Sequence, residues 1–198
     1  MKEQKVGKTL ETRLYFIRHA HSAYTPDERE RPLSESGHAD AQHVKEALEN
    51  EGISRVLSSP YKRAVQTVEL LAGSIGSGIE LMEGFRERQL SEGPVDDFAA
   101  AIAKVWSDED YAFQGGESNR EAKARGVAAA LEVLERYPGE RIAIGTHGNL
   151  MVLVMNHFDS RYGVEFWREL AMPDIYCLRF DGVELAGVER IGITVAGP

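Results

Sequence analysis

The sequence predicts a three-layer α/β/α fold, in which helices cover both faces of a mostly parallel, doubly wound sheet. Short apolar runs rich in β-branched and aromatic residues alternate with longer segments of helical spacing along most of the chain. Near the end, an Asp181-Gly182 pair separates two further strand-like runs and predicts a C-terminal hairpin. The 198 residues, 42% of them hydrophobic and 28% charged, suit a globular protein with a sizeable core. We therefore expect residues 1–198 to form a single domain.

The predicted elements follow one another without a domain boundary. Residues 1–12 lack an apolar core and are expected to be a loose lead-in. The first strand covers residues 13–18 and continues into a polar loop at residues 20–33. The elements expected after this loop are a helix at 34–50, a strand at 53–58, a helix capped by Ser59 with Pro60 in its first position, a strand at 79–82, helices at 95–106 and 118–136, a strand from 141 that ends at His147, a helix at 150–158, and hairpin strands at 175–180 and 183–191.

Composition limits the classes of partner. The formal net charge of −9 argues against a surface for nucleic acid or anionic membranes, which would need a basic face. The longest apolar run, residues 150–155, is too short to cross a bilayer. The single cysteine, Cys177, lies in an apolar run, so we expect a core residue and no intrachain disulfide. These features predict a cytoplasmic protein and leave its oligomeric state open.

The apolar run at residues 14–17 ends abruptly in Arg18 and His19. In open α/β sheets, ligands bind outside the carboxyl ends of the strands. The pair is therefore a candidate for the floor of an active site, and the alternative is a surface Arg-His pair. A later strand ends in the same way at His147, where Gly148 would allow close approach of a ligand to the next helix.

Arg63 falls in the first turn of the helix that follows the second strand. The first turn of a helix favours anions and disfavours a cation, so an arginine there is either a surface residue or a sign of a bound anion. Arg18, His19, Arg63 and His147 would all meet at one edge of a parallel sheet. Arginine forks match phosphate oxygens, and a histidine can act as a nucleophile. This combination favours phosphoryl transfer through a phosphohistidine.

These motifs, in this order, resemble the histidine phosphatase superfamily, also called phosphoglycerate mutase-like, over residues 14–180. The family's opening Arg-His-Gly stands here as Arg18-His19-Ala20. The further matching segments are Leu33-Ser34-Glu35-Ser36-Gly37, Ser58-Ser59-Pro60-Tyr61-Lys62-Arg63, Gly116-Glu117-Ser118 and Thr146-His147-Gly148. The resemblance implies that His19 becomes phosphorylated, and that Arg18, Arg63 and His147 hold the phosphoryl group.

The resemblance also assigns residues that the pattern alone would leave at the surface. It places the general acid at Glu87, which by itself would be taken for a salt-bridged surface carboxylate; Glu92 and Asp174 are the next candidates. Ser22 and Thr25 would offer hydroxyl groups to the substrate, Thr25 in a place where many members carry asparagine. His21, where the family commonly has Glu or Gln, is expected at the rim of the pocket.

The function implied is a metal-independent phosphatase for a small phosphorylated metabolite, without a cofactor. Three alternatives remain open. A mutase would use the same site and return the phosphoryl group to the substrate. A metal site could use His19 and His21, although the arginines would repel a cation. A non-catalytic module could bind phosphorylated ligands without turning them over.

Overall fold

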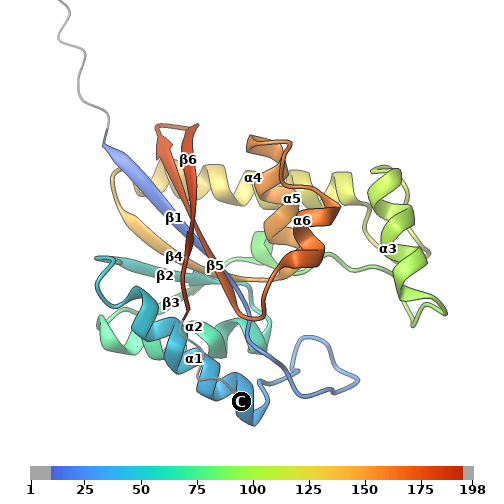
Figure 1. Ribbon diagram of the computed structural model, residues 1–198, viewed down its shortest axis with the longest axis horizontal. Helices are drawn as coiled ribbons and strands as arrows, with labels where there is room; N and C mark the ends of the chain where they lie inside the picture. The colour runs from blue at the N-terminus through green and yellow to red at the C-terminus, as the bar shows by residue number, and fades with distance from the viewer. Residues whose placement is uncertain (1–9, 194–198) are drawn as a thin grey trace, which may run out of the picture.

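The computed structural model describes residues 10–193, and most of the predicted lead-in lies outside this range (Figure 1). Across these residues, six strands form one sheet in the order β3-β2-β4-β1-β5-β6. Four of the strands run parallel, namely β1 (Glu11–Arg18), β2 (Arg55–Ser58), β3 (Ile79–Leu81) and β4 (Arg141–Thr146). The last two, β5 (Asp174–Asp181) and β6 (Glu184–Ile191), form the C-terminal hairpin, and β5 pairs antiparallel with β1. The predicted mostly parallel sheet with a terminal hairpin is confirmed.

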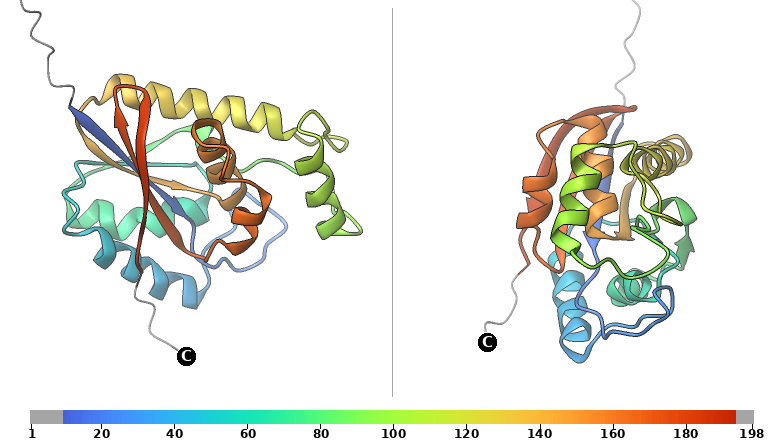
Figure 2. Two further views of the ribbon diagram at one scale, coloured as in Figure 1. Left: turned by 45° about the horizontal axis from the view of Figure 1, so that its top comes forward. Right: turned by 90° about the vertical axis from the view of Figure 1, so that its right-hand side faces the viewer.

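Helices cover both faces of the sheet because its central strands are apolar on both faces (Figure 2). In β1, Leu14 and Phe16 pack with α4 (Asn119–Arg136) and α5 (Gly148–Phe158). Tyr15 and Ile17, which point the opposite way, pack with α1 (Glu35–Leu48) and α2 (Lys62–Ser74). The three predicted layers are therefore present. The remaining helical segments are η1 (Glu83–Phe85), α3 (Phe98–Ser107), which stands apart from the sheet in Figure 1, and α6 (Val164–Glu169).

Several helix ends follow directly from local sequence. The Ser34 hydroxyl accepts a hydrogen bond from the Gly37 N–H and caps α1. At α4, Ser118 and Glu121 satisfy each other's backbone N–H groups in a capping box. In the hairpin, Gly182 adopts a φ of 62° at the turn between β5 and β6, a conformation that favours glycine.

Some predicted boundaries were wrong. β1 begins at Glu11, inside the predicted lead-in, because Thr12 is buried and pairs with Phe180 of β5. α3 begins only at Phe98, where the Asp97 side chain caps it. The short α6 was not predicted.

The start of α2 also differs from the prediction. α2 begins at Lys62, after Tyr61, and so two residues beyond Pro60. Tyr61 and not Ser59 is the N-cap residue of α2. The Ser59 hydroxyl oxygen accepts a hydrogen bond from the Tyr61 N–H just before the helix, at 3.2 Å, and also contacts His147. Arg63 still falls in the first turn, as the second residue of the helix.

The strand order decides where the candidate residues meet. β4 lies between β1 and β2, so the carboxyl ends of these three parallel strands are neighbours. Within the described residues, no helix has the length and apolar character needed to cross a membrane. The neighbouring strand ends carry His19, Ser59 and His147.

Candidate active site

His19 follows β1 directly, and the residue is only 8% exposed. Its Nδ1 lies 2.7 Å from the carbonyl oxygen of Ala20, which can only accept, so Nδ1 carries the proton. The Nε2 atom therefore keeps its lone pair and accepts a 3.2 Å hydrogen bond from Arg63 Nε. Burial and then the charge of Arg63 lower the pKa of His19 to about 3. At neutral pH the imidazole is neutral and its Nε2 is a free base.

His147 is the N-cap residue of α5 and is fully buried. Its Nε2 lies 2.8 Å from the hydroxyl oxygen of Ser59, which fixes the ring. The ring packs edge-on against His19, with 5.2 Å between centroids, and against Tyr61, with 5.0 Å. Burial and then the neighbouring His19 hold the pKa of His147 well below its usual value. The two predicted histidines thus lie side by side in their neutral forms.

Arg63 links α2 to both His19 and the polar loop. Its Nε donates to His19, and its Nη1 donates to the carbonyl oxygen of Glu28 at 2.7 Å. The side chain is buried, and this burial lowers the pKa of Arg63. A guanidinium nevertheless stays charged in a protein, so Arg63 brings a permanent cation to the Nε2 face of His19.

Arg18 reaches the same end of the sheet by packing over Gly148. Its Nη1 donates to the carbonyl oxygens of Leu170 and Ala171 at 2.9 and 3.0 Å. Its Nε is buried and has no partner within the described residues. A Cβ atom on Gly148 would lie 2.9 Å from Arg18 Nε. Gly148 is therefore needed for the close approach of Arg18.

Glu87 lies at the N-terminus of α5, the helix end that His147 caps. Its Oε1 accepts hydrogen bonds from the backbone N–H of Leu150 at 3.1 Å and of Arg88 at 2.8 Å. Helix N-termini favour a carboxylate because their N–H groups and the dipole are positive. The structure therefore places Glu87 at the helix end that His147 caps.

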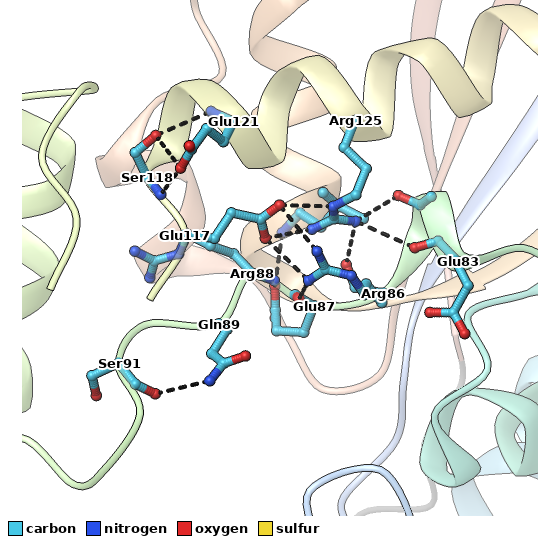
Figure 3. A network of polar contacts seen from close by, with 12 residues as sticks. Glu83, Arg86, Glu87, Arg88, Gln89, Ser91, Glu117, Ser118, Glu121 and Arg125 are labelled. Carbon is cyan, nitrogen blue, oxygen red and sulfur yellow. Dashed lines mark hydrogen bonds and ion pairs between the residues drawn. The ribbon is translucent and has the colours of Figure 1, made fainter. Parts of the chain in front are cut away.

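A charged network holds the segment that carries Glu87 (Figure 3). Arg125 of α4 donates to both oxygens of Glu117, at 2.9 and 2.8 Å, and to the carbonyl oxygens of Gly84 and Arg86. The Arg86 side chain also donates to Glu117. Burial opposes the charge of Glu117, but the hydrogen bond from Arg125 and the charges of both arginines hold its pKa below the usual value.

The network gives a physical role to the Gly116-Glu117-Ser118 segment. Glu117 fixes the segment that carries Glu87 from the α4 side. From the sheet side, the Thr146 hydroxyl donates to the Phe85 carbonyl oxygen at 2.9 Å. The backbone before Glu87 is therefore held at both sides.

Four further candidates make other contacts. Thr25 donates its hydroxyl to the Asp27 carbonyl within the polar loop, and Ser22 pairs with Leu33 in an isolated bridge. His21 is exposed and shares a hydrogen bond with Ser34 at the start of α1. Asp174, the reserve candidate for the acid, is buried in an ion pair with Arg190.

Glu92, the other reserve acid, is exposed in the loop after Glu87. Among residues 10–193, no three His, Cys, Asp or Glu side chains gather to form a candidate metal site.

Sequence reasoning missed several polar residues at the site. Ser59 was interpreted as a helix cap, and Arg31 lay in a run of alternating charges that resembles a solvated loop. Arg88 and Asn149 are buried and carry side-chain nitrogen atoms without partners in the described part of the chain. In Figure 3 the Arg88 guanidinium points away from the Glu117 network. The only signal for Arg88 and Asn149 was their position beside Glu87 and Gly148.

Comparison of the sequence with models of protein families identifies the same family that the motifs resemble. A model of the histidine phosphatase superfamily (branch 1) matches residues 14–186. The chain belongs to the histidine phosphatase superfamily. This membership confirms the family inferred from the motifs and supports a phosphatase-type enzyme.

Relatives within the superfamily include proteins named as mutases. The chain is 28% identical over 150 residues to a probable phosphoglycerate mutase, GpmB, of Salmonella typhi, covering 68% of this chain and 69% of the relative. It is 27% identical over 158 residues to phosphoglycerate mutase-like protein 4 of Arabidopsis thaliana, covering 70% and 67%.

Solved structures of the superfamily share the fold. Bacillus stearothermophilus YhfR superposes with a TM-score of 0.75 at 24% identity, covering 93% of this chain and 98% of that one. A mycobacterial glucosyl-3-phosphoglycerate phosphatase gives 0.74 at 20% identity, covering 93% and 100%. A mutant phosphoserine phosphatase from Entamoeba histolytica, in complex with phosphoserine, gives 0.72 at 18% identity, covering 89% and 96%.

Proposed function

We propose that this superfamily member hydrolyses phosphomonoesters through a phosphohistidine on Nε2 of His19. One observation carries the proposal: the unprotonated Nε2 of a neutral, buried His19 faces the permanent cation Arg63 and lies beside His147. A nucleophile with a lone pair, fixed by a hydrogen bond at its other nitrogen, is prepared for in-line attack.

In the first step, His19 Nε2 forms a bond to phosphorus while the bond to the ester oxygen breaks. Arg18, Arg63 and His147 line the place where the equatorial oxygens gain charge. Glu87 gives a proton to the leaving oxygen, which departs as an alcohol.

In the second step, water attacks the phosphorus of the phosphohistidine. Glu87 accepts a proton from this water, the bond between phosphorus and Nε2 breaks, and inorganic phosphate leaves. His19 and the protonated Glu87 are regenerated. Because guanidinium groups supply the positive charge that a metal would otherwise give, we expect no need for a divalent cation.

The proposed substrate is a small phosphorylated metabolite. The names of the relatives and neighbours support phosphoglycerates, a glucosylated phosphoglycerate and phosphoserine as first candidates. All of them carry a carboxylate. The buried Arg88, next to Glu87 and without an ion-pair partner in the described part of the chain, supports an anionic leaving group.

Other parts of the proposal rest on composition. The acidic charge of −9 supports a small-molecule substrate and no nucleic-acid partner. The single cysteine, free and buried, supports a reducing compartment and thus the cytoplasm. We also propose that residues 1–198 act as one domain.

The test is turnover of a panel that holds 2- and 3-phosphoglycerate, phosphoserine, sugar phosphates and 4-nitrophenyl phosphate. Release of inorganic phosphate in the presence of a chelator, together with acid-labile label on the protein, is expected. Isomerisation of phosphoglycerate without phosphate release would assign a mutase instead. Absence of both reactions, with intact phosphate binding, would indicate a non-catalytic module.

A further inference from the structure

The polar loop before α1 places a carboxylate against the arginines of the site. Glu28 Oε2 lies 3.3 Å from Arg63 Nη1, and Glu28 Oε1 lies 2.5 Å from Arg31 Nη2. The same Arg63 Nη1 also donates to the backbone carbonyl of Glu28 at 2.7 Å. One carboxylate thus connects Arg63, which faces the nucleophile, to a second guanidinium from the loop.

Arg31 belongs to the electrostatic environment of His19. Its charge lowers the pKa of His19 after burial, Arg63 and Arg18, and it also acts on Arg63. Its side chain is 18% exposed, and its buried Nε has no partner in the described part of the chain. Arg31 is therefore a further cation at the site, with an N–H group still to be satisfied.

Burial is unequal across this cluster. The Arg63 side chain is 6% exposed, whereas the Glu28 side chain is 56% exposed. Buried guanidinium groups need an anion nearby, because an unpaired buried charge is costly. A solvent-exposed carboxylate forms weak ion pairs that another anion can replace. A phosphoryl group carries more charge than a carboxylate and matches arginine forks at several oxygens.

The loop backbone is held in place, so an exchange of anions needs only a side-chain movement. Asp27 Oδ1 accepts hydrogen bonds from the backbone N–H groups of Arg29 and Glu30. The Arg29 carbonyl oxygen accepts from the N–H of Lys62 at the start of α2. The Glu28 side chain can rotate into solvent while this turn stays attached to α2.

We propose that Glu28 is a tethered anion that occupies Arg31 and Arg63 until the phosphoryl group of the substrate replaces it. Arg31 is then a further guanidinium that binds the phosphoryl group, beside Arg18 and Arg63. This inference rests on the proposed function for the identity of the incoming anion. It makes Glu28 a competitor of the substrate, so removing its charge strengthens phosphate binding.

The test measures binding of inorganic phosphate by calorimetry and by thermal shift, which need no turnover. The Glu28→Gln variant is expected to lower the phosphate Kd about two- to fivefold, the range of an exposed ion pair. Its gain in Tm with phosphate should exceed that of the wild type. The matched control is Glu30→Gln, an equal change of charge at an exposed residue of the same loop. Arg31→Gln is expected to raise the phosphate Kd.

Each outcome bears on the inference separately from the proposed function. An unchanged or higher Kd in Glu28→Gln, or an equal decrease in Glu28→Gln and Glu30→Gln, overturns it. An Arg31→Gln variant that binds phosphate with an unchanged or lower Kd also overturns the inference. If Glu28→Gln alone tightens phosphate binding but no panel substrate turns over, the tethered anion is supported and the proposed hydrolase function fails. If substrates turn over and Glu28→Gln binds phosphate like the wild type, the function stands and the inference fails.

Discussion

His19 Nε2 and Arg63 Nε face each other at 3.2 Å, while His19 Nδ1 is fixed by the carbonyl oxygen of its neighbour Ala20. Because the proton is on Nδ1, Nε2 is unprotonated, and its lone pair points toward the cation Arg63, from which it accepts a hydrogen bond. A phosphoryl group held by Arg63 would meet this lone pair. His21, two residues later, has the opposite environment, exposed to solvent and joined to Ser34.

The first prediction separates these two histidines. His19→Ala should abolish the acid-labile phosphate that rapid quench traps on the protein and lower turnover by several decades, as loss of a nucleophile does elsewhere. His21→Ala is the matched control and should retain the label, with its main effect on KM. Label that persists in His19→Ala and disappears in His21→Ala would move the nucleophile to His21.

The second prediction concerns Glu87, whose Oε1 is bound by the N-terminus of α5. Glu87→Gln keeps the shape and hydrogen-bonding oxygen but removes the proton donor. Hydrolysis of alkyl phosphates should therefore slow by about 10²–10⁴-fold, and that of 4-nitrophenyl phosphate much less, because nitrophenolate leaves without a proton. Equal losses for both substrates would exclude Glu87 as the general acid.

The third prediction uses the contact between Gly148 and Arg18. In Gly148→Ala the new Cβ would lie 2.9 Å from Arg18 Nε and so displace the guanidinium. We expect kcat/KM to fall roughly ten- to hundredfold, the scale of a small misplacement of a binding group. Gly78→Ala is the control, since a Cβ there meets no atom within 4 Å. A Gly148→Ala variant with wild-type kcat/KM would show that Arg18 does not hold the substrate.

The fourth prediction follows from the lowered pKa of His19. The unfolded chain has a histidine pKa of about 6.5, whereas the folded value is about 3. Between these values the unfolded chain binds the additional proton. The stabilisation from a neutral His19 is complete above pH ~6.5 and is lost as the pH falls toward 3. His147 acts in the same direction because its pKa is also lowered.

This linkage is measurable as a slope. As the pH falls below about 6.5, the free energy of unfolding should decrease by about 1.4 kcal/mol per pH unit for each histidine whose pKa is lowered by folding. Denaturant titrations of the wild type and His19→Asn at several pH values from 4 to 7.5 compare the slopes. The variant should show a smaller slope. Parallel curves would mean that folding does not lower the pKa of His19.

The fifth prediction tests the network around Glu117. Glu117→Gln removes the charge that Arg86 and Arg125 share, so the free energy of unfolding should fall by about 1.5–3 kcal/mol. The kcat should also fall, because the segment that carries Glu87 loses its anchor on α4. Glu165→Gln, in an exposed ion pair with Arg168, should cost less than about 1 kcal/mol and leave kcat unchanged. Equal effects of both variants would contradict an anchoring role.

Much of the fold could be predicted because the decisive signals are local. The run from Leu14 to Ile17 is buried on both faces of the sheet, Ser118 caps α4, and the Asp181-Gly182 turn closes the hairpin. The short α6 gave no comparable signal. It is fixed by tertiary contacts, such as the edge-on packing of Phe166 against Tyr162 and Tyr176.

The site was predictable to the extent that its residues end strands. The sequence pattern identifies Arg18, His19 and His147, because each is a polar residue at the end of an apolar strand or just after it. Ser59 and Arg31 do not, since their roles depend on partners far away in the chain or on the path of a loop. The Ser59 hydroxyl meets His147 across 88 residues, and the Glu28 carboxylate bridges Arg31 to Arg63. Sequence spacing carries no information about such contacts.

The position of β4 between β1 and β2 has a consequence for how the protein acquires its site. β1 and β2 are not neighbours in the sheet, and β1 pairs instead with β4 and β5 from the last third of the chain. Bringing such distant segments together is slow, because the loop entropy is lost before the contacts form. His147 arrives with β4, so the anion pocket closes only when the central strand inserts. A nascent or refolding chain should therefore gain phosphate affinity as one of its last events, and phosphate binding becomes a measure of completed folding.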